Sequence, residues 1–256
     1  MISEKWIEEA KNILDKIKKK EMQNIKKAAN IIADSILSGH VCYLFGVGHS
    51  TIPVEETYPR YGGIIGFLPI LELPLSYFTH VIGDLGIFQF QFLEMLEGYG
   101  ERILKNYILD PKDSMIIYSN SGVTPIIIDV ALTAKEKGVK LIAVTSIEHS
   151  KNLKSEHSSG KKLYEIADVT IDNCTPQGDV IIELESFKKH RVGPLSTLGS
   201  IAVANLISIE VAQEIVKRGG ELLVNPVRGY TPEEKEMLER NIKEYGRRLA
   251  MHLIHI

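Results

Sequence analysis

Two turns rich in glycine and small polar side chains are the segments of this sequence best suited to bind an anion. The first is Gly46-Val47-Gly48-His49-Ser50-Thr51 and the second is Ser119-Asn120-Ser121-Gly122-Val123-Thr124-Pro125. Each turn follows a short apolar run and leads into a stretch with helical spacing of apolar residues. Because glycine lets the backbone approach a ligand and a helix start offers free amides, both turns favour phosphate. Together they predict a cradle for a phosphorylated small molecule.

Helix capping is the alternative explanation of each turn. Thr124 followed by Pro125 has the form of an N-cap and first-position pair. For one turn alone, capping and ligand binding explain the residues equally well, whereas two turns at equivalent positions favour ligand binding. His49 has two open interpretations, since its ring can face the ligand or the solvent. The residues predicted to contact the ligand are Gly48, His49, Ser50, Thr51, Ser119, Asn120, Ser121 and Thr124.

A dinucleotide-binding turn is a second interpretation of Gly46-Val47-Gly48. That motif requires a third glycine at the position of Thr51, and an acidic residue for the ribose, for which Glu72 is the candidate. It also leaves the second turn unexplained. The phosphate cradle is therefore favoured, and no cofactor is expected.

The pattern around the turns alternates between strands and helices. Continuously apolar strands indicate a sheet that is covered on both faces. The alternation predicts an α/β fold with a three-layer, doubly wound, mostly parallel sheet of the flavodoxin-like or Rossmann-like kind. Ligands bind such sheets beyond the carboxyl ends of the strands, where the strand order reverses. The expected strands are 41–45, 64–70, 115–118, 141–144 and 169–171, and the expected helices are 52–61, 89–107, 125–137 and 196–218.

Helical extensions are expected at both ends of the chain. Residues 1–38 read as a leading helical arm, with a bend near Lys18 to Gln23 and an end at Gly39. Residues 232–256 read as a terminal helix with Thr231 as its N-cap. Packing of the leading arm on its own sheet and packing between subunits are both open. Without a linker or a repeat, residues 1–256 are expected to form a single domain.

Composition narrows the class of protein. The 256 residues are 44% hydrophobic and 25% charged, which is typical of a soluble globular chain. A net charge of -3 gives no electrostatic reason to expect a nucleic-acid or membrane partner. The two cysteines form no disulfide framework, and neither has neighbours at metal-ligand spacing, so no metal is expected. With no signal peptide and no run of about 18 apolar residues, a cytoplasmic location is expected.

The two turns resemble those of the SIS (sugar isomerase) domain family. Residues 46–50 match its Gly-x-Gly-x-Ser pattern and residues 119–124 match its Ser-x-Ser-Gly-x-Thr pattern. The resemblance runs over residues 1–256 and is closest to bacterial SIS proteins related to phosphoheptose isomerase. The segment 221–227 departs from the family pattern, so no role is carried over to Asn225. Further points of resemblance are Glu55-Glu56, Arg60, Gly62-Gly63, Glu148 to Lys151, Ser159 to Lys162, Asp172-Asn173, Gly178-Asp179 and Gly193 to Thr197.

This resemblance implies a nucleotide-free α/β protein that binds a sugar phosphate. It also implies a homodimer or homotetramer, with sites that a neighbouring subunit sometimes completes. The expected activity is aldose–ketose isomerisation with a carboxylate base. Because the same fold serves several functions, two alternatives stay open: a non-catalytic sugar-phosphate sensor, and an ether lyase acting on a muramic acid phosphate.

Glu56 is the expected base, on its resemblance to the carboxylate position of phosphoheptose isomerases. Moving a proton between C1 and C2 of a sugar needs a base whose pKa lies near neutrality. A solvated carboxylate on a helix face is the alternative reading of Glu56. His149, beyond the strand at 141–144, is expected to open the sugar ring or to donate a hydrogen bond. A structural bond to a loop explains His149 equally well.

Four further polar residues complete the set of candidates. Ser146 is expected to add a ligand hydroxyl at the end of the strand 141–144. Ser196 opens the helix 196–218, where it caps the helix or contacts the ligand. Glu94 and Glu97 lie among apolar residues, where partly buried carboxylates can be functional, but the polar side of an amphipathic helix explains both more simply.

Overall fold

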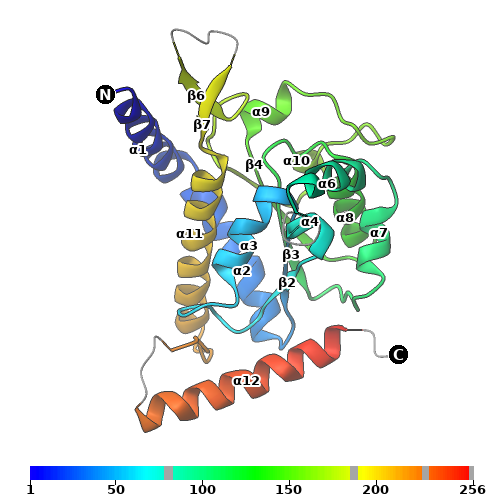
Figure 1. Cartoon of the computed structure of the whole chain (residues 1–256). Helices are drawn as coiled ribbons and strands as arrows, with labels where there is room; N and C mark the ends of the chain where they lie inside the picture. The colour runs from blue at the N-terminus through cyan, green and yellow to red at the C-terminus, as the bar shows by residue number, and fades with distance from the viewer. Residues whose placement is uncertain (78–82, 185–189, 227–230, 254–256) are drawn as a thin grey trace.

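Five parallel strands form the central sheet, in the order β2-β1-β3-β4-β5 (Figure 1). The computed structural model describes residues 1–77, 83–184, 190–226 and 231–253. Since β2 and β3 lie on opposite sides of β1, the strand order reverses between β1 and β3. The prediction of a doubly wound parallel sheet is confirmed. The strands are β1 Cys42–Gly46, β2 Phe67–Ile70, β3 Ser114–Tyr118, β4 Lys140–Thr145 and β5 Val169–Asp172.

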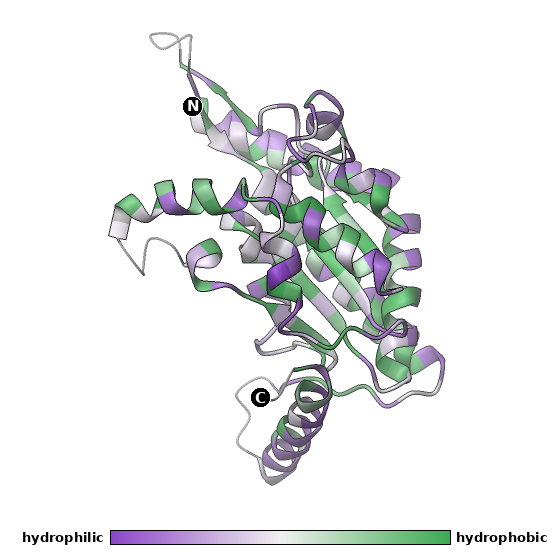
Figure 2. Cartoon of the chain, turned by 90° about the vertical axis from the view of Figure 1, so that its right-hand side faces the viewer, coloured by the Kyte–Doolittle hydropathy of each residue, from purple (hydrophilic) through white to green (hydrophobic). Residues whose placement is uncertain are grey.

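Both faces of the sheet are buried by helices. Successive residues of a strand point to opposite faces, so Cys42 and Leu44 of β1 join one core while Tyr43 and Phe45 join the other. Figure 2 shows the hydrophobic strands enclosed between helices. The first core is covered by α1 Ile2–Lys20, α2 Met22–Leu37, α3 Ile52–Thr57 and α11 Ser196–Lys217, and the second by α7 Tyr99–Leu104, α8 Pro125–Glu136 and α10 Leu163–Ile166.

The leading arm is two helices, α1 and α2, that meet at Glu21, which confirms the predicted bend. Helix α2 packs on the sheet of its own chain, and its Ile25 and Ile32 are completely buried. Helix α1 is buried only along one side, and its Ile7 and Leu14 are 49% and 45% exposed. The arm thus packs on its own sheet through α2 and leaves part of α1 exposed.

Two predicted helices are shorter than expected, and the strand expected over 64–70 begins only at Phe67. The helix expected over 89–107 is split into α6 Gly86–Glu94 and α7, because Gly98 between them adopts a left-handed conformation with φ +86°. The helix expected over 52–61 ends at Thr57, since Tyr58 precedes Pro59 and is extended. A residue before proline is disfavoured in the α conformation.

A small antiparallel hairpin and several one-turn helices were not predicted. Residues Gly193-Pro194, expected just before a helix, belong to the second strand of the hairpin. These elements are too short for a periodic apolar pattern. They are β6 Val180–Glu183, β7 Arg191–Pro194, α4 Leu73–Ser76, α9 Ile147–Lys151 and the 3-10 turns Gly48–Thr51 and Gly83–Leu85.

The last two long helices confirm their predictions. Helix α11 is long and apolar enough to cross a membrane by length and composition, yet its Val203, Ile207 and Val211 are buried against the sheet. Helix α12, Pro232–His252, lies at the edge of the sheet where the strands begin (Figure 1). Thr231 caps α12 as expected, since its Oγ1 accepts a hydrogen bond from the Glu234 amide. Residues 254–256 of the predicted terminal helix lie outside the described residues.

Candidate functional site

The two predicted anion-binding turns lie next to each other. Gly46 and Tyr118, the last residues of β1 and β3, are paired in the sheet. The turns that follow them therefore leave the same edge of the sheet, at the point where the strand order reverses. The loops after β4 and β5 continue along this edge, because Tyr118 pairs with Val144 and Thr145 pairs with Asp172. This edge is the site that a doubly wound sheet offers to a ligand.

The first turn depends on glycine at position 46. A Cβ atom added to Gly46 would lie 2.1 Å from the carbonyl oxygen of Ser50. The turn is a 3-10 helix, and the buried Thr51 hydroxyl donates to the Gly48 carbonyl at 2.7 Å. Thr51 thus stabilises the turn itself. Ser50 is half-buried and His49 is exposed on the same turn.

The second turn is braced by Asn120. Its Oδ1 accepts a hydrogen bond from Asn173 Nδ2 at 3.0 Å and lies 2.9 Å from the Thr175 hydroxyl. Its backbone carbonyl accepts from the Ser146 amide at 3.1 Å. One residue therefore joins the turn after β3 to the loops after β4 and β5. Its side-chain oxygen is used for structure rather than pointed to a ligand.

Three hydroxyls of the second turn differ in what they do. Ser119 Oγ accepts from the Gly122 amide at 3.0 Å and so closes the turn. Thr124 has the extended backbone of an N-cap, but within the described part of the chain its hydroxyl does not cap α8. Ser121 and Thr124 are half-buried at the carboxyl edge. Capping therefore does not account for Thr124.

Ser146 and His149 have structural partners. The buried Ser146 hydroxyl donates to the Thr175 carbonyl at 2.7 Å and accepts from the His149 amide at 3.1 Å. His149 Nδ1 accepts from the Gly178 amide at 3.3 Å. These contacts account for both side chains without a ligand, and their roles in ligand binding stay predictions.

Asp179 of the hairpin, rather than Ser196, caps helix α11. Its Oδ1 accepts from the Leu195 and Ser196 amides at 2.9 and 2.6 Å, and its Oδ2 accepts from the Ser196 hydroxyl at 2.8 Å. Ser196 is the first residue of the helix, and its hydroxyl is bound to that carboxylate. The sequence did not indicate this cap because it comes from a separate element 17 residues earlier.

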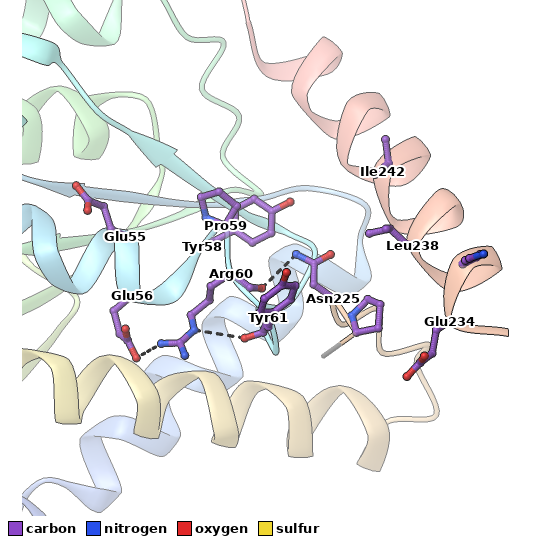
Figure 3. Close-up of a pocket in the computed structure, with 12 residues that line it drawn as sticks. Glu55, Glu56, Tyr58, Pro59, Arg60, Tyr61, Asn225, Glu234, Leu238 and Ile242 are labelled. Carbon is purple, nitrogen blue, oxygen red and sulfur yellow. Dashed lines mark hydrogen bonds and ion pairs between the residues drawn. The ribbon is translucent and has the colours of Figure 1, made fainter. Parts of the chain in front are cut away.

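Glu56 points toward α11 (Figure 3). Its carboxylate forms an ion pair with Arg60 and accepts from Asn205 Nδ2 at 3.2 Å. Glu55 points the other way, so the two neighbouring carboxylates face different surroundings (Figure 3). Glu56 also lines a cavity of about 820 Å³ between α3 and α12, together with Glu55, Tyr58, Pro59, Arg60, Tyr61, Asn225, Pro226, Glu234, Lys235, Leu238 and Ile242.

Helix α6 lies over the two turns, which the sequence did not indicate. The Phe90 ring is so close to Gly48 that an added Cβ there would be 2.9 Å from its Cζ atom. One turn later, burial and, to a smaller extent, the charge of Glu156 raise the pKa of Glu94 to about 7. The Glu156 amide in turn donates to the Val123 carbonyl of the second turn at 3.0 Å. A carboxyl group with a near-neutral pKa therefore lies beside the turns.

Because the pKa of Glu94 is raised in the folded protein, the free energy of unfolding should fall as the pH rises from acidic to mildly alkaline. Below pH 4.5 the carboxyl is protonated in both the folded and the unfolded chain, and its contribution to the stability of the fold is fully present. As the pH rises to about 7, the unfolded chain ionises first, so the folded state loses stability. Glu94→Gln cannot ionise and should melt at a higher temperature than the natural protein in alkaline buffer, but not below pH 4.5. If the melting temperatures of Glu94→Gln and the natural protein differed by the same amount at every pH, this prediction would be contradicted.

Comparisons with known proteins identify the family of this chain. The model of the SIS domain matches residues 5–146. A UPF0309 protein of Geobacillus sp. (strain WCH70) is 34% identical over 218 residues, covering 85% of each chain. A UPF0309 protein of Thermoanaerobacter pseudethanolicus is 35% identical over 225 residues, covering 87% of each.

A solved structure is similar in fold. Phosphoheptose isomerase from Neisseria gonorrhoeae superposes with a TM-score of 0.52 over 81% of this chain and 95% of that one, at 13% identity. At this identity the likeness shows the fold alone. By the domain match and the UPF0309 relatives, the chain belongs to the SIS-domain family, among the UPF0309 proteins.

Proposed function

We propose that this protein binds a sugar phosphate at the carboxyl edge of the sheet and isomerises it between aldose and ketose forms. The observation that carries the proposal is the meeting of the two turns where the strand order reverses. Membership of the SIS family and the fold shared with phosphoheptose isomerase support it. We further propose a cytoplasmic homodimer or homotetramer that needs neither a cofactor nor a nucleic-acid or membrane partner.

The phosphate is held, in this proposal, by the amides of Gly48 and His49 and by the hydroxyls of Ser121 and Thr124, since the Ser50 amide already donates to the Val47 carbonyl at 3.0 Å. Because Asn120 and Ser119 already fix the second turn, its donors are oriented before the ligand arrives. Donors that are fixed in advance need no reorganisation when the ligand binds. Ser50, His49 and Ser146 remain further candidates around the ligand, and Ser196 would contribute through the start of α11.

Two carboxyl groups compete for the role of the base. Glu56 is favoured by its resemblance to the carboxylate of phosphoheptose isomerases, but Arg60 and Asn205 already bind it. Glu94 lies beside the turns, and its pKa of about 7 is the value that general base catalysis requires. We retain Glu56 as the base, with His149 as the group that assists ring opening. Glu94 is the alternative base.

Exchange of the proton on C2 tests the isomerase proposal. The purified protein would be incubated with a panel of aldose and amino-sugar phosphates in deuterated water and followed by NMR. Deuterium at C2 of at least one sugar is the expected result. Tight binding of a sugar phosphate without any exchange would overturn the isomerase proposal and leave a sensor.

A sensor is the second candidate, because the carboxylate of Glu56 is engaged by an arginine and an amide. Calorimetric binding without turnover would favour it. An ether lyase is a third candidate, and release of lactate from a muramic acid phosphate would identify it. If none of these ligands binds, the proposed site itself is wrong.

Ser121→Ala is expected to weaken sugar-phosphate binding. A hydrogen bond to a charged group contributes about 1.5–3 kcal/mol, so the dissociation constant should rise by one to two orders of magnitude. Calorimetry with the best-binding sugar phosphate measures this change. Ser38→Ala is the control, because the Ser38 hydroxyl donates to the Ser35 carbonyl between α2 and β1, at the opposite end of the strands from both turns. An unchanged affinity in Ser121→Ala would remove this hydroxyl from the site.

A further inference from the structure

Three potential metal ligands from separate elements meet at the edge of the sheet opposite the turns. They are His40 in the loop before β1, Asp113 in the loop before β3, and His252 at the end of α12. One ligand atom of each lies within 4.8 Å of the other two. Asp113 and His252 are buried, and the His40 side chain is 16% exposed.

The orientation of His252 is fixed by a backbone carbonyl. Its Nδ1 lies 2.7 Å from the Arg248 carbonyl oxygen, which can only accept, so Nδ1 carries the proton. In the neutral ring the Nε2 atom then has a lone pair, which faces Asp113 Oδ1 at 3.0 Å. Two lone pairs facing each other in a buried place repel unless a proton or a metal cation lies between them. An N–H···O bond on the far side of a ligating histidine is also the usual arrangement in metal sites.

His40 distinguishes a metal from a proton. Its Nδ1 is buried and has no hydrogen-bond partner among the described residues, and it lies 3.4 Å from the same Asp113 oxygen. A proton on His252 would satisfy His252 and Asp113 but leave His40 Nδ1 unpaired. A metal ion bound to all three atoms satisfies each of them. Leaving a buried polar atom unpaired is costly.

The distances from Asp113 to the two imidazole rings suit a tetrahedral ion. Two ligands of Zn²⁺ at tetrahedral angles lie about 3.3 Å apart, given metal–ligand bonds of about 2.0–2.1 Å. The distances from Asp113 Oδ1 to the two imidazole nitrogens are 3.0 and 3.4 Å. Asp113 is itself held in place, since its Oδ2 accepts from the Asp110 amide at 2.8 Å and its Oδ1 from the Val41 amide at 3.1 Å.

The charges around the cluster allow a cation. The Arg248 guanidinium is close, because it donates to the carbonyls of Ile36 and His40, but it is paired with Glu244 at 2.7 Å. The Asp110 carboxylate lies 3.9 Å from His40 Nδ1 and adds negative charge.

We propose that His40, Asp113 and His252 bind one divalent transition-metal ion, of which Zn²⁺ fits the imidazole and carboxylate ligands best. Such an ion would link the last turn of α12 to the loops that begin β1 and β3. Its role would be structural, since the cluster lies at the opposite end of the strands from the two turns. The inference does not rest on the proposed sugar-phosphate site.

Metal binding is tested on the full-length protein after removal of metals with a chelator. Calorimetric titration with Zn²⁺ should show one bound ion per chain, and the melting temperature should rise on its addition. His40→Asn is the decisive variant, because His40 Nδ1 makes no hydrogen bond to any described residue that the substitution would remove. In chelator it should melt like the natural protein, yet bind Zn²⁺ about 100-fold more weakly or worse.

His49→Ala is the matched control, since it removes an exposed histidine at the other end of the sheet and should bind the ion unchanged. His252→Ala should also lose the ion, and comparison with His40→Asn separates loss of metal from loss of folding. Absence of Zn²⁺ binding by the natural protein at micromolar concentration would overturn the proposal. An unchanged affinity and stoichiometry in His40→Asn would overturn it as well.

Discussion

Glu56→Gln is expected to bind the sugar phosphate normally and to lose C2 exchange by about 10²–10⁴-fold, the usual contribution of a general base. Glutamine has nearly the same shape and can still contact Arg60 and Asn205, so the fold should be kept. What it loses is the ability to take up the proton. Deuterium incorporation measured by NMR, at saturating sugar phosphate, gives the change.

Glu94→Gln and Glu101→Gln make this experiment decisive. Glu101 is an exposed carboxylate paired with Lys105 on α7, so its replacement should leave exchange unchanged. If Glu94→Gln abolishes exchange and Glu56→Gln does not, the role of base passes to Glu94. A rate that rises with pH around 7 in the natural protein would accompany that result, because the ionised form of Glu94 would be the active one.

Gly46→Ala is expected to destabilise the protein by about 3 kcal/mol, at the upper end for an overpacked position, and to abolish sugar-phosphate binding. The added Cβ would lie 2.1 Å from the Ser50 carbonyl oxygen, which is backbone and cannot rotate away. The whole first turn must then move, and its amides with it. For a chain of this size the melting temperature should fall by about 6–12 °C.

Gly246→Ala is the control for that substitution. An added Cβ at Gly246 in helix α12 meets nothing within 4 Å. Alanine in a helix interior is more stable than glycine by about 0.5–1 kcal/mol, so this variant should melt slightly higher and bind normally. Retention of binding by Gly46→Ala would show that the first turn does not hold the phosphate.

Local patterns in the sequence were sufficient for the sheet and for the two turns. The runs at 41–45 and 115–118 are continuously apolar because both faces of β1 and β3 are buried, and turns with glycine and small polar residues follow both strands. Because β1 and β3 are parallel neighbours in the sheet, the turns that follow them leave from the same edge. The position of the two turns at one edge of the sheet therefore followed from the order of elements along the chain.

Contacts between distant segments could not be predicted in this way. The placement of Phe90 over Gly48, the capping of α11 by Asp179, and the meeting of His40 with His252 join residues with no periodic relation in the sequence. Their side-chain types are common on protein surfaces. Only the packing of helices on the sheet determines which of them come together.

Asn120 also limits which residue types its position can accept. A carboxylate there would accept the same hydrogen bond from Asn173 and keep the same distance to Thr175. It would, however, put a negative charge beside the proposed phosphate and repel it. The uncharged amide therefore lets one residue join three loops, two through its side chain and the third through its backbone carbonyl, next to a bound anion. Asn120→Asp should keep the architecture while rejecting the ligand.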